Sequence, residues 1–353
     1  MKGKFFYLNN NVYIRKNCIN ILPELLKDYN NILLFTGKKS FENKKIMVLN
    51  FLNNSNVTVY SDFLNNPNNM DMNKAIEFLN RKKYEVILAV GGGSVIDFAK
   101  IFRYKSDSSI PLIAVPTTAG TGSEATKFAV FYINGEKHSI EDERILPNYA
   151  IIDSQFLFNS PPYLKACTGF DAFAQAIESF WSVNSNEESR EYAMQSMVIC
   201  KENLANYVNS NDETTAENMA LAAHLSGKAI NISKTTAPHA FSYFFTIKYG
   251  IPHGHAVALS FSNIFELNIH TSEKNLNDKR GIDFVISIME ELKKLFDKGY
   301  FQKLFKQIGL ETNIARLGIN GVAEAVNEVN LQRLKNNPRK FELEESYNLF
   351  SGR

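Results

Sequence analysis

Two groups of side chains are placed to hold a metal ion. Three of the chain's six histidines, His239, His253 and His255, lie close together, the first opening a helical stretch and the others on a Gly/Pro-rich turn. Upstream, Asp171 and Gln175 lie on one face of a predicted helix with apolar neighbours. A buried carboxylate needs a positive partner, and His and Asp ligands with an open position suit Fe(II) or Zn(II), which polarise carbonyl oxygens. The spacing allows the helix and the turn to converge on one ion, with Asp171, His239 and His253 among the candidate ligands, although each histidine alone is more often structural.

A run of glycines is typical of a phosphate-binding turn. The run follows a predicted strand, Glu85–Val90, and leads into a predicted helix, Val95–Tyr104. Glycines let the backbone approach a phosphate closely, and the first N–H groups of a helix attract an anion. The run lacks the GxGxxG spacing, so a tight turn without a ligand is the alternative. The candidate nucleotide-binding residues here are Gly91, Gly92, Gly93, Ser94 and Asp97.

A second loop of small residues follows the next predicted strand. The loop Pro116–Glu124 comes directly after Leu112–Val115 and is rich in hydroxyl side chains and glycine. Ligands of doubly wound sheets bind at the carboxyl ends of parallel strands, so two such loops favour a nucleotide site more than one does. The candidate binding residues in this loop are Thr117, Thr118, Thr121 and Ser123.

A parallel sheet is needed to position these loops. Between about residues 30 and 155, short apolar runs typical of buried strands alternate with stretches of helical periodicity. This order predicts an α/β nucleotide-binding architecture, with helices covering a parallel sheet. The strands are expected at Ile32–Phe35, Val57–Tyr60, Val86–Val90, Leu112–Val115 and Ala150–Ile152, and the helices at Phe41–Asn50, Met72–Lys83 and Val95–Tyr104.

The second half of the chain has a different pattern. After Pro161 and Pro162 the strand signals almost vanish and long amphipathic stretches follow, which predicts an all-α domain. The helices are expected at Tyr163–Phe180, Glu187–Val208, Ala216–Ile230, Ile282–Phe296 and Phe301–Ile308. We therefore divide the chain into a nucleotide-binding α/β domain, residues 1–158, and a helical metal- and substrate-binding domain, residues 159–353.

Composition excludes several classes of partner. The net charge of +2 is spread along the chain, so no basic surface for nucleic acid or an anionic membrane is expected. We find no signal peptide and no apolar run long enough to span a bilayer, which predicts a cytoplasmic protein. The three cysteines are far apart in the sequence, as expected in a reducing compartment.

Together these motifs resemble the iron-dependent, or type III, alcohol dehydrogenase family over nearly the whole chain. The glycine run, the Pro116–Glu124 loop, the segment Leu146–Asp153, the pair of Asp171 and Glu178, and His239 with Pro252-His253-Gly254 occur in the family's order. The resemblance implies a Rossmann-like NAD(P) domain followed by an all-α metal domain, the dehydroquinate synthase-like fold. It also implies hydride transfer between a nicotinamide cofactor and a small aldehyde or alcohol at the metal, in a homodimer or larger homo-oligomer.

The sequence departs from the family's pattern at two positions. The family usually has a second histidine ligand where this chain has Gln175, which leaves Gln175 as a weak neutral oxygen donor and the identity of the ion open. A further histidine, the usual proton relay, is replaced by Tyr243. Tyr243 and His255 are the candidate catalytic residues that could take its role.

Within the family, the chain looks most like the phosphonoacetaldehyde reductase branch. The stretches that carry this likeness are Gln175–Asn186, Lys234–His239, Tyr249–Leu259 and Arg333–Arg339. The substrate would be phosphonoacetaldehyde, reduced to 2-hydroxyethylphosphonate, with Lys234 and Thr235 as candidate donors to its anionic group. The alternatives are another small aldehyde or alcohol, a dehydroquinate synthase-like lyase, and a non-catalytic protein that binds metal or nucleotide.

The end of the first predicted strand bears on the choice of cofactor. Gly37, Lys38 and Ser40 lie there, and no acidic residue among them is available to bond a ribose 2′-hydroxyl. Lys38 and Ser40 suit the 2′-phosphate of NADPH, so the sequence favours NADPH over NADH.

Overall fold

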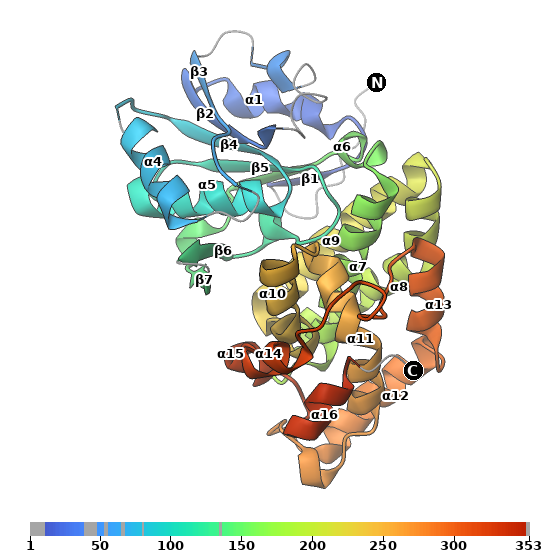
Figure 1. Ribbon diagram of the computed structural model, residues 1–353. Coiled ribbons are helices and arrows are strands. Elements are labelled where there is room, and N and C mark those ends of the chain that lie inside the picture. The colour runs from blue at the N-terminus through green and yellow to red at the C-terminus, as the bar shows by residue number, and fades with distance from the viewer. Residues whose placement is uncertain are drawn as a thin grey trace. The chain divides into compact units, whose positions relative to one another are not determined.

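The computed structural model describes residues 11–38, 48–52, 56–64, 68–79, 81–133 and 136–350 (Figure 1). The chain divides into two compact units, Met1–Ser160 with Asp212–Gly227, and Pro161–Asn211 with Lys228–Arg353. The segment Asp212–Gly227, which the sequence had placed in the helical half, thus belongs to the first unit. The physical reason is direct packing, because Gly227 lies against the backbone of Gly122.

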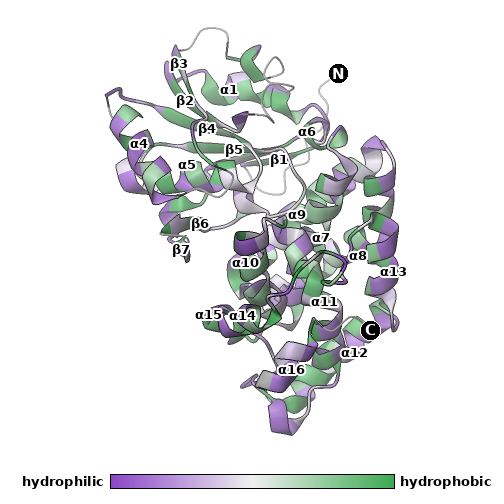
Figure 2. Ribbon diagram, in the orientation of Figure 1, coloured by the Kyte–Doolittle hydropathy of each residue, from purple (hydrophilic) through white to green (hydrophobic). Residues whose placement is uncertain are grey.

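The first unit is built on a parallel sheet, as the sequence predicted, but the sheet has six strands and β1 was not among the five that we expected. Along the sheet the order is β1-β8-β5-β4-β2-β3, and every neighbouring pair is parallel. The strands are β1 Val12–Ile14, β2 Asn31–Thr36, β3 Asn56–Tyr60, β4 Val86–Gly91, β5 Leu112–Pro116 and β8 Tyr149–Ile152. In Figure 2 the central strands are predominantly hydrophobic, as expected for a sheet covered on both faces.

Alternate residues of each strand enter two separate cores. Ile87 and Ala89 of β4 pack in the core that includes α5, whereas Val86, Leu88 and Val90 pack in the core on the other face. This period of two lets a continuous apolar strand supply both faces. The helical elements of the unit are η1 Cys18–Ile21, α1 Leu22–Leu26, α4 Asn69–Leu79, α5 Gly93–Ser106, η2 Ser123–Ala125, η3 Glu143–Ile145 and α6 Gln155–Phe158.

Two details of this unit differ from the sequence expectations. A hairpin of two antiparallel strands, β6 Phe128–Ile133 and β7 Glu136–Glu141, interrupts the alternation of strands and helices and was not predicted. The helix expected at Phe41–Asn50 lies mostly outside the described residues.

The second unit is helical, in agreement with the sequence. Its central helix is α7, Pro162–Trp181, which begins after Pro161 and is buried along most of its length. The other helical elements are α8 Glu187–Asn209, α9 Glu213–Ser233, α10 Ala237–Tyr249, α11 His253–Ile269, η4 Glu273–Asn275, α12 Ile282–Leu295, α13 Tyr300–Ile308, α14 Val322–Asn327, α15 Leu331–Leu334 and α16 Leu343–Asn348. Only the second part of α9 belongs to this unit. No helix in the described ranges has both the length and the apolar character needed to cross a bilayer.

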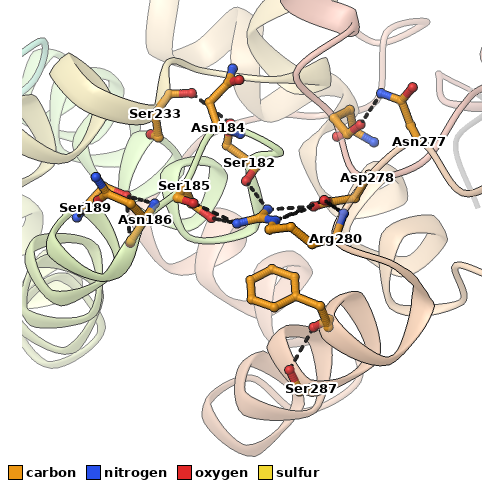
Figure 3. Close-up of polar contacts among 12 residues, drawn as sticks. Ser182, Asn184, Ser185, Asn186, Ser189, Ser233, Asn277, Asp278, Arg280 and Ser287 are labelled. Atoms are coloured by element: carbon orange, nitrogen blue, oxygen red, sulfur yellow. Dashed lines mark hydrogen bonds and ion pairs between the residues drawn. The ribbon is translucent and has the colours of Figure 1, made fainter.

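An arginine fastens the C-terminal end of α7 (Figure 3). The Arg280 guanidinium donates to the carbonyl oxygens of Ser182 and Ser185, each at 2.7 Å, and to the carboxylate of Asp278. The Ser182 hydroxyl donates in turn to the carbonyl oxygen of Ser233, the last residue of α9, at 2.7 Å. These bonds satisfy carbonyl groups that helix ends leave without partners and hold the ends of α7 and α9 together.

Candidate metal centre and nucleotide loops

Three side chains from three helices of the second unit converge on one point. Asp171 lies on α7, His239 near the start of α10 and His253 at the first position of α11, and their ligand atoms lie within 4.8 Å of one another. Asp171 Oδ1 is 3.3 Å from His239 Nε2 and 3.9 Å from His253 Nε2. The structure thus brings together the three residues that the sequence proposed as ligands.

The buried polar atoms at this point could be satisfied by a bound cation. Asp171 Oδ1 and His239 Nε2 are buried and face each other, and neither makes a hydrogen bond of regular geometry to a described residue. A buried polar atom without a partner costs about 1–3 kcal/mol, and more when it is charged. A carboxylate oxygen and imidazole nitrogens are ligands for Fe(II) and Zn(II), so a divalent ion would satisfy these atoms. The cluster therefore fits a metal centre.

Glu178 fixes the orientation of His239. One of its carboxylate oxygens accepts a hydrogen bond from His239 Nδ1, which directs Nε2 toward Asp171. The other oxygen accepts from the backbone N–H groups of Thr236 and His239, at 2.9 and 3.3 Å, and so caps the N-terminus of α10. A carboxylate that orients a histidine ligand is a common support of metal sites. Glu178 lies two turns after Asp171 on the same face of α7, but no role for it was predicted from the sequence.

The carboxylates around His239 control its protonation. Burial disfavours the charged ring, but the neighbouring Glu178 and Asp171 outweigh burial and raise the pKa of His239 to about 10. Without an ion, the ring therefore carries two protons at neutral pH. The second proton on the ring contributes to the stability of the fold. This contribution is complete below the unfolded pKa of about 6.5 and is lost as the pH rises through about 10.

We expect metal affinity to rise with pH for the same reason. An ion can bind His239 only after the Nε2 proton leaves, so at least one proton is released per ion and the apparent affinity rises about tenfold per pH unit below pH 10. Competition between the protein and a chelator for Zn(II) at about pH 7 and about pH 8, corrected for the chelator's own protonation, measures this slope. An affinity that does not change over this interval would contradict the assignment of His239.

Gly254 lets α7 and α11 approach closely enough for the cluster to form. A Cβ atom at Gly254 would lie 1.9 Å from the carbonyl oxygen of Cys167 and 2.9 Å from Cβ of Asp171. The sequence placed His253 and His255 on a turn, but they lie in the first turn of α11, with Pro252 as the N-cap. Pro favours helix starts because its fixed φ and missing N–H are tolerated there, which explains the difference.

Gln175 lies beside the cluster in a supporting role. Its side chain is buried, and its Nε2 donates to Asp171 Oδ2 at 3.2 Å. The amide thereby leaves the other oxygen of Asp171, Oδ1, directed at the two histidines. In this conformation the amide nitrogen of Gln175 orients a ligand, and the place of Gln175 as a fourth ligand is a proposal.

The two candidate proton donors have different positions. Tyr243 is one turn after His239, and its ring stacks on His253 with the centroids 5.9 Å apart. His255 is engaged elsewhere, because Nδ1 lies 2.8 Å from the Tyr163 hydroxyl and Nε2 lies 2.7 Å from the carbonyl oxygen of Glu311. Burial lowers the pKa of His255, and a neutral ring satisfies both contacts. The structure therefore favours Tyr243 at the cluster.

The candidate substrate residues lie in the loop that joins α9 to α10. Lys234 adopts a left-handed backbone conformation with φ of 65°, which is uncommon for a residue with a side chain. Thr235 is buried, and its carbonyl oxygen accepts a hydrogen bond from Asn336 at 2.9 Å. Strained backbone conformations cluster at functional sites, so this loop is a candidate for substrate contact.

In the first unit, the glycine run forms a close junction between β4 and α5. Gly91 ends β4, Gly92 is the N-cap of α5, and no side chain of the described residues caps the helix. A Cβ atom at Gly93 would lie 2.5 Å from Thr121 Oγ1, and one at Gly92 would lie 3.3 Å from Thr118 Oγ1. The glycine run and the hydroxyl loop are therefore in contact, and the half-buried Ser94 follows on the helix. This arrangement leaves the first N–H groups of α5 available to an anion.

Two of the proposed nucleotide-binding residues, Asp97 and Ser123, hold the loop in place. The Ser123 hydroxyl donates to Asp97 Oδ1, and the backbone N–H of Val130 donates to Asp97 Oδ2 at 3.0 Å. Both oxygens of Asp97 are thus used within the protein, which joins α5 to η2 and to β6. Thr117 is buried, and its N–H donates to the carbonyl oxygen of Gly91 at 3.0 Å.

The end of β2 has an acidic neighbour that the sequence did not reveal. Gly37 and Lys38 follow β2, and Lys38 Nζ lies 2.7 Å from Asp62 Oδ1, just beyond the end of β3. Ser40, the third proposed residue, lies outside the described residues. Parallel neighbours end at the same edge of a sheet, which is why residues far apart in sequence meet here.

A parallel sheet with glycine and hydroxyl loops at its strand ends, and a helical unit with a carboxylate and two histidines, describe a nucleotide-binding and metal-binding protein. Residues 9–154 match the family model of iron-containing alcohol dehydrogenase, and residues 165–352 match the model of the C-terminal part of the Fe-containing alcohol dehydrogenase family. The chain belongs to the iron-containing alcohol dehydrogenase family.

Individual relatives are moderately similar in sequence. Alcohol dehydrogenase 4 of Saccharomyces cerevisiae is 29% identical over 235 residues, and the match covers 61% of this chain and 61% of the length of that relative. A phosphonoacetaldehyde reductase of Streptomyces viridochromogenes is 30% identical over 235 residues, 59% of each chain. The 4-hydroxybutyrate dehydrogenase of Clostridium kluyveri is 28% identical over 316 residues, 81% of this chain and 83% of the relative.

Solved structures agree with the fold over almost the whole chain. Sulfoacetaldehyde reductase from Bifidobacterium kashiwanohense, solved in complex with NAD+, superposes with a TM-score of 0.84 at 25% identity and covers 99% of this chain and 98% of its own. An iron-containing alcohol dehydrogenase from Thermotoga maritima superposes with a TM-score of 0.83 at 24% identity, with 98% of each chain covered. The likeness confirms the predicted order of an α/β unit and a helical unit.

Proposed function

We propose that this chain is a metal-dependent, NAD(P)H-linked oxidoreductase that reduces a small aldehyde to a primary alcohol. The observation that carries the proposal is the cluster of Asp171, His239 and His253, whose buried atoms Asp171 Oδ1 and His239 Nε2 make no hydrogen bond of regular geometry to a described residue. When bound, a divalent ion would supply Lewis-acid polarisation of the aldehyde oxygen, and the nicotinamide would supply the hydride. Fe(II) is the first choice because of the family, and Zn(II) suits the same ligands.

The chain's own residues would prepare the site for this reaction. Glu178 holds His239 in the orientation that exposes Nε2, and Gln175 turns Asp171 so that Oδ1 faces the histidines. Tyr243 is our candidate proton donor, because its hydroxyl group is carried on a ring stacked against His253. In the first unit, the N–H groups at the start of α5 and the hydroxyls of the neighbouring loop would bind the pyrophosphate.

A substrate with an anionic group is supported by two relatives and by one residue. The phosphonoacetaldehyde reductase and the sulfoacetaldehyde reductase are both named for two-carbon aldehydes that carry an acidic group. Lys234, held in an uncommon conformation in the loop before His239, provides a positive charge suited to such a group. We therefore propose phosphonoacetaldehyde, reduced to 2-hydroxyethylphosphonate, as the substrate.

For the cofactor we propose NADPH in preference to NADH. Lys38 is placed at the end of β2, where dinucleotide-binding folds contact the ribose. The 2′-phosphate of NADPH would replace Asp62 as the partner of Lys38, whereas NADH offers no group that needs this cation. We also propose, from the family, a homodimer or larger homo-oligomer.

One matrix of assays tests the function. The metal-free protein, reloaded with Fe(II) or Zn(II), is given phosphonoacetaldehyde, succinate semialdehyde, lactaldehyde or butyraldehyde with NADPH or NADH, and oxidation of the cofactor is followed. We expect phosphonoacetaldehyde with NADPH to give the highest kcat/KM. Turnover that persists after complete removal of metal would sink the metal mechanism. No turnover of any aldehyde with metal present would favour a lyase or a non-catalytic protein.

Lys234→Gln tests the contact with the anionic group. The variant should raise KM for phosphonoacetaldehyde about tenfold, because a charge-assisted hydrogen bond is lost. The neutral substrate butyraldehyde is the matched control, and its KM should be nearly unchanged. Equal effects on the two aldehydes would show that Lys234 supports the loop and does not select the substrate.

A further inference from the structure

A buried acid and histidine pair lies next to the hydroxyl loop of the first unit. His224, on α9, has its Nδ1 atom 3.2 Å from Oε1 of Glu124, on η2. The two side chains are only 3% and 4% exposed. With its hydrogen on Nδ1, the His224 ring donates this hydrogen bond to the Glu124 carboxylate. The proposed reaction gives neither residue a role, although burying such a pair is costly unless the geometry is good.

The backbone of α9 also contacts the turn Gly122–Glu124, in which Glu124 lies. Gly122 has a φ of 59°, and a Cβ atom there would lie 2.5 Å from Cα of Gly227 and 2.8 Å from the carbonyl oxygen of Ala223. Conversely, a Cβ atom at Gly227 would lie 2.6 Å from the carbonyl oxygen of Gly122. Both contacts need glycine, so α9 and the turn are packed backbone against backbone.

The turn is held from α5 as well. Ser123, between Gly122 and Glu124, donates its hydroxyl hydrogen to Asp97 of α5. The turn is therefore bonded to α5 through Ser123 and to α9 through Glu124 and Gly122. It directly follows Thr118 and Thr121, which contact the glycine run. Any movement of the turn would move these two threonines relative to the start of α5.

We infer that His224 is a positioning residue for the dinucleotide. His224 acts through its hydrogen bond to Glu124, which holds the Thr117–Ser123 loop in the conformation that binds the dinucleotide. The inference rests on the proposed nucleotide site in this loop. Residues that touch the ligand are expected on strand ends, whereas His224 acts from a helix and lies 100 positions after Glu124 in the chain. Its loss should weaken binding of the cofactor while contacts at the metal cluster are unaffected.

The variants follow from the geometry of the pair. His224→Leu keeps the volume but removes the donor, which leaves the Glu124 carboxylate buried without its partner. His224→Asn keeps an N–H group near the position of Nδ1 and should restore most of the binding. Gly227→Ala is an independent disturbance, because its methyl group would press on Gly122 although alanine favours the helix itself.

The matched control is Glu213→Gln. Glu213 forms an exposed ion pair with Lys16, at 2.5 Å, and so joins the same helix to the same unit at a place remote from the loop in sequence. If α9 acted only by general attachment, this variant would also weaken nucleotide binding. We expect it to bind nucleotide as the parent protein does.

The experiment measures dissociation constants of NADPH and NADH by the change in nicotinamide fluorescence, without aldehyde, on the full-length protein. We expect roughly tenfold weaker binding for His224→Leu and for Gly227→Ala, with His224→Asn close to the parent. In steady-state assays KM for the cofactor should rise while KM for the aldehyde stays nearly constant. If His224→Leu does not fold, Gly227→Ala decides whether the contacts of α9 support nucleotide binding.

Two different failures can be distinguished. Folded His224→Leu or Gly227→Ala protein that binds nucleotide as tightly as the parent would overturn the role of the α9 contacts and leave the proposed function intact. A parent protein that binds neither nucleotide would overturn the proposed function itself, and the inference with it. Equal weakening by His224→Leu and His224→Asn would overturn the assignment of the Nδ1 hydrogen bond.

Discussion

Replacement of Asp171 by Asn is expected to lower kcat roughly a thousandfold or more and to leave the purified protein almost without metal. Asn has the same shape as Asp but lacks the negative charge, and Asp171 Oδ1 is the atom on which both histidines converge. Element analysis of the purified protein and the aldehyde reductase assay measure the two effects. Because the shape is kept, circular dichroism should show an unchanged helix content.

The control for this variant is Asp283→Asn, the same change at an exposed position in the first turn of α12. It should keep both metal and activity. Gln175→His should have the opposite effect on metal affinity. It adds an imidazole one turn after Asp171, so the protein should bind the ion more tightly. Full turnover by metal-free Asp171→Asn protein would mean that the cluster is not the reaction site.

Gly254→Ala is expected to disrupt the metal centre without removing any ligand. The added methyl group would lie 1.9 Å from the backbone of Cys167, so α7 and α11 must move apart and separate Asp171 from His253. We expect a loss of roughly 2 kcal/mol in the stability of the helical unit and a large loss of bound metal. Thermal unfolding and metal content measure these effects.

Gly250→Ala is the matched control for this variant. Gly250 has a φ of 65°, but a Cβ atom there would meet nothing within 4 Å. The Gly250→Ala variant should lose about 1 kcal/mol of stability, from backbone strain alone, and should retain its metal. If Gly254→Ala resembled Gly250→Ala in both measurements, the close approach of the two helices would not be what forms the cluster.

Periodicity explains why much of the fold could be predicted. The strand Val86–Gly91 is apolar throughout and is bounded by a glycine run, which is the pattern of a strand buried on both faces. The long stretch after Pro161 has helical periodicity and a proline at its start, and it became α7. These signals lie within short stretches of sequence, so they can be recognised without knowledge of the tertiary structure.

The hairpin β6–β7 was missed although its signal was present. The sequence has an Asn-Gly pair at 134–135, directly after the β-branched and aromatic stretch Phe128–Ile133, and this pair is typical of two-residue hairpin turns. The start of α11 was also missed, since Pro252 was interpreted as part of a turn and not as a helix start.

The supporting residues of both sites could not be read from the sequence. Glu178 shares a helix face with Asp171, but its hydrogen bonds to α10 depend on how two helices pack. Asp62 and His224 meet Lys38 and Glu124 only through strand order and helix placement. Candidate ligands and binding residues can be recognised in the sequence by their type and spacing. Their supporting partners depend on long-range contacts, which a single sequence does not show.

The division of α9 between the two units has a consequence for how the chain can be cut or recombined. A fragment that stops at Ser160 would lack Asp212–Gly227, so Glu124 would lose its histidine and Gly122 would lose the glycine packed against it. The sheet could therefore not be exchanged between relatives with a single crossover. Grafting it intact requires three junctions in the gene, one after Ser160, one before Asp212 and one after Gly227 within α9 itself.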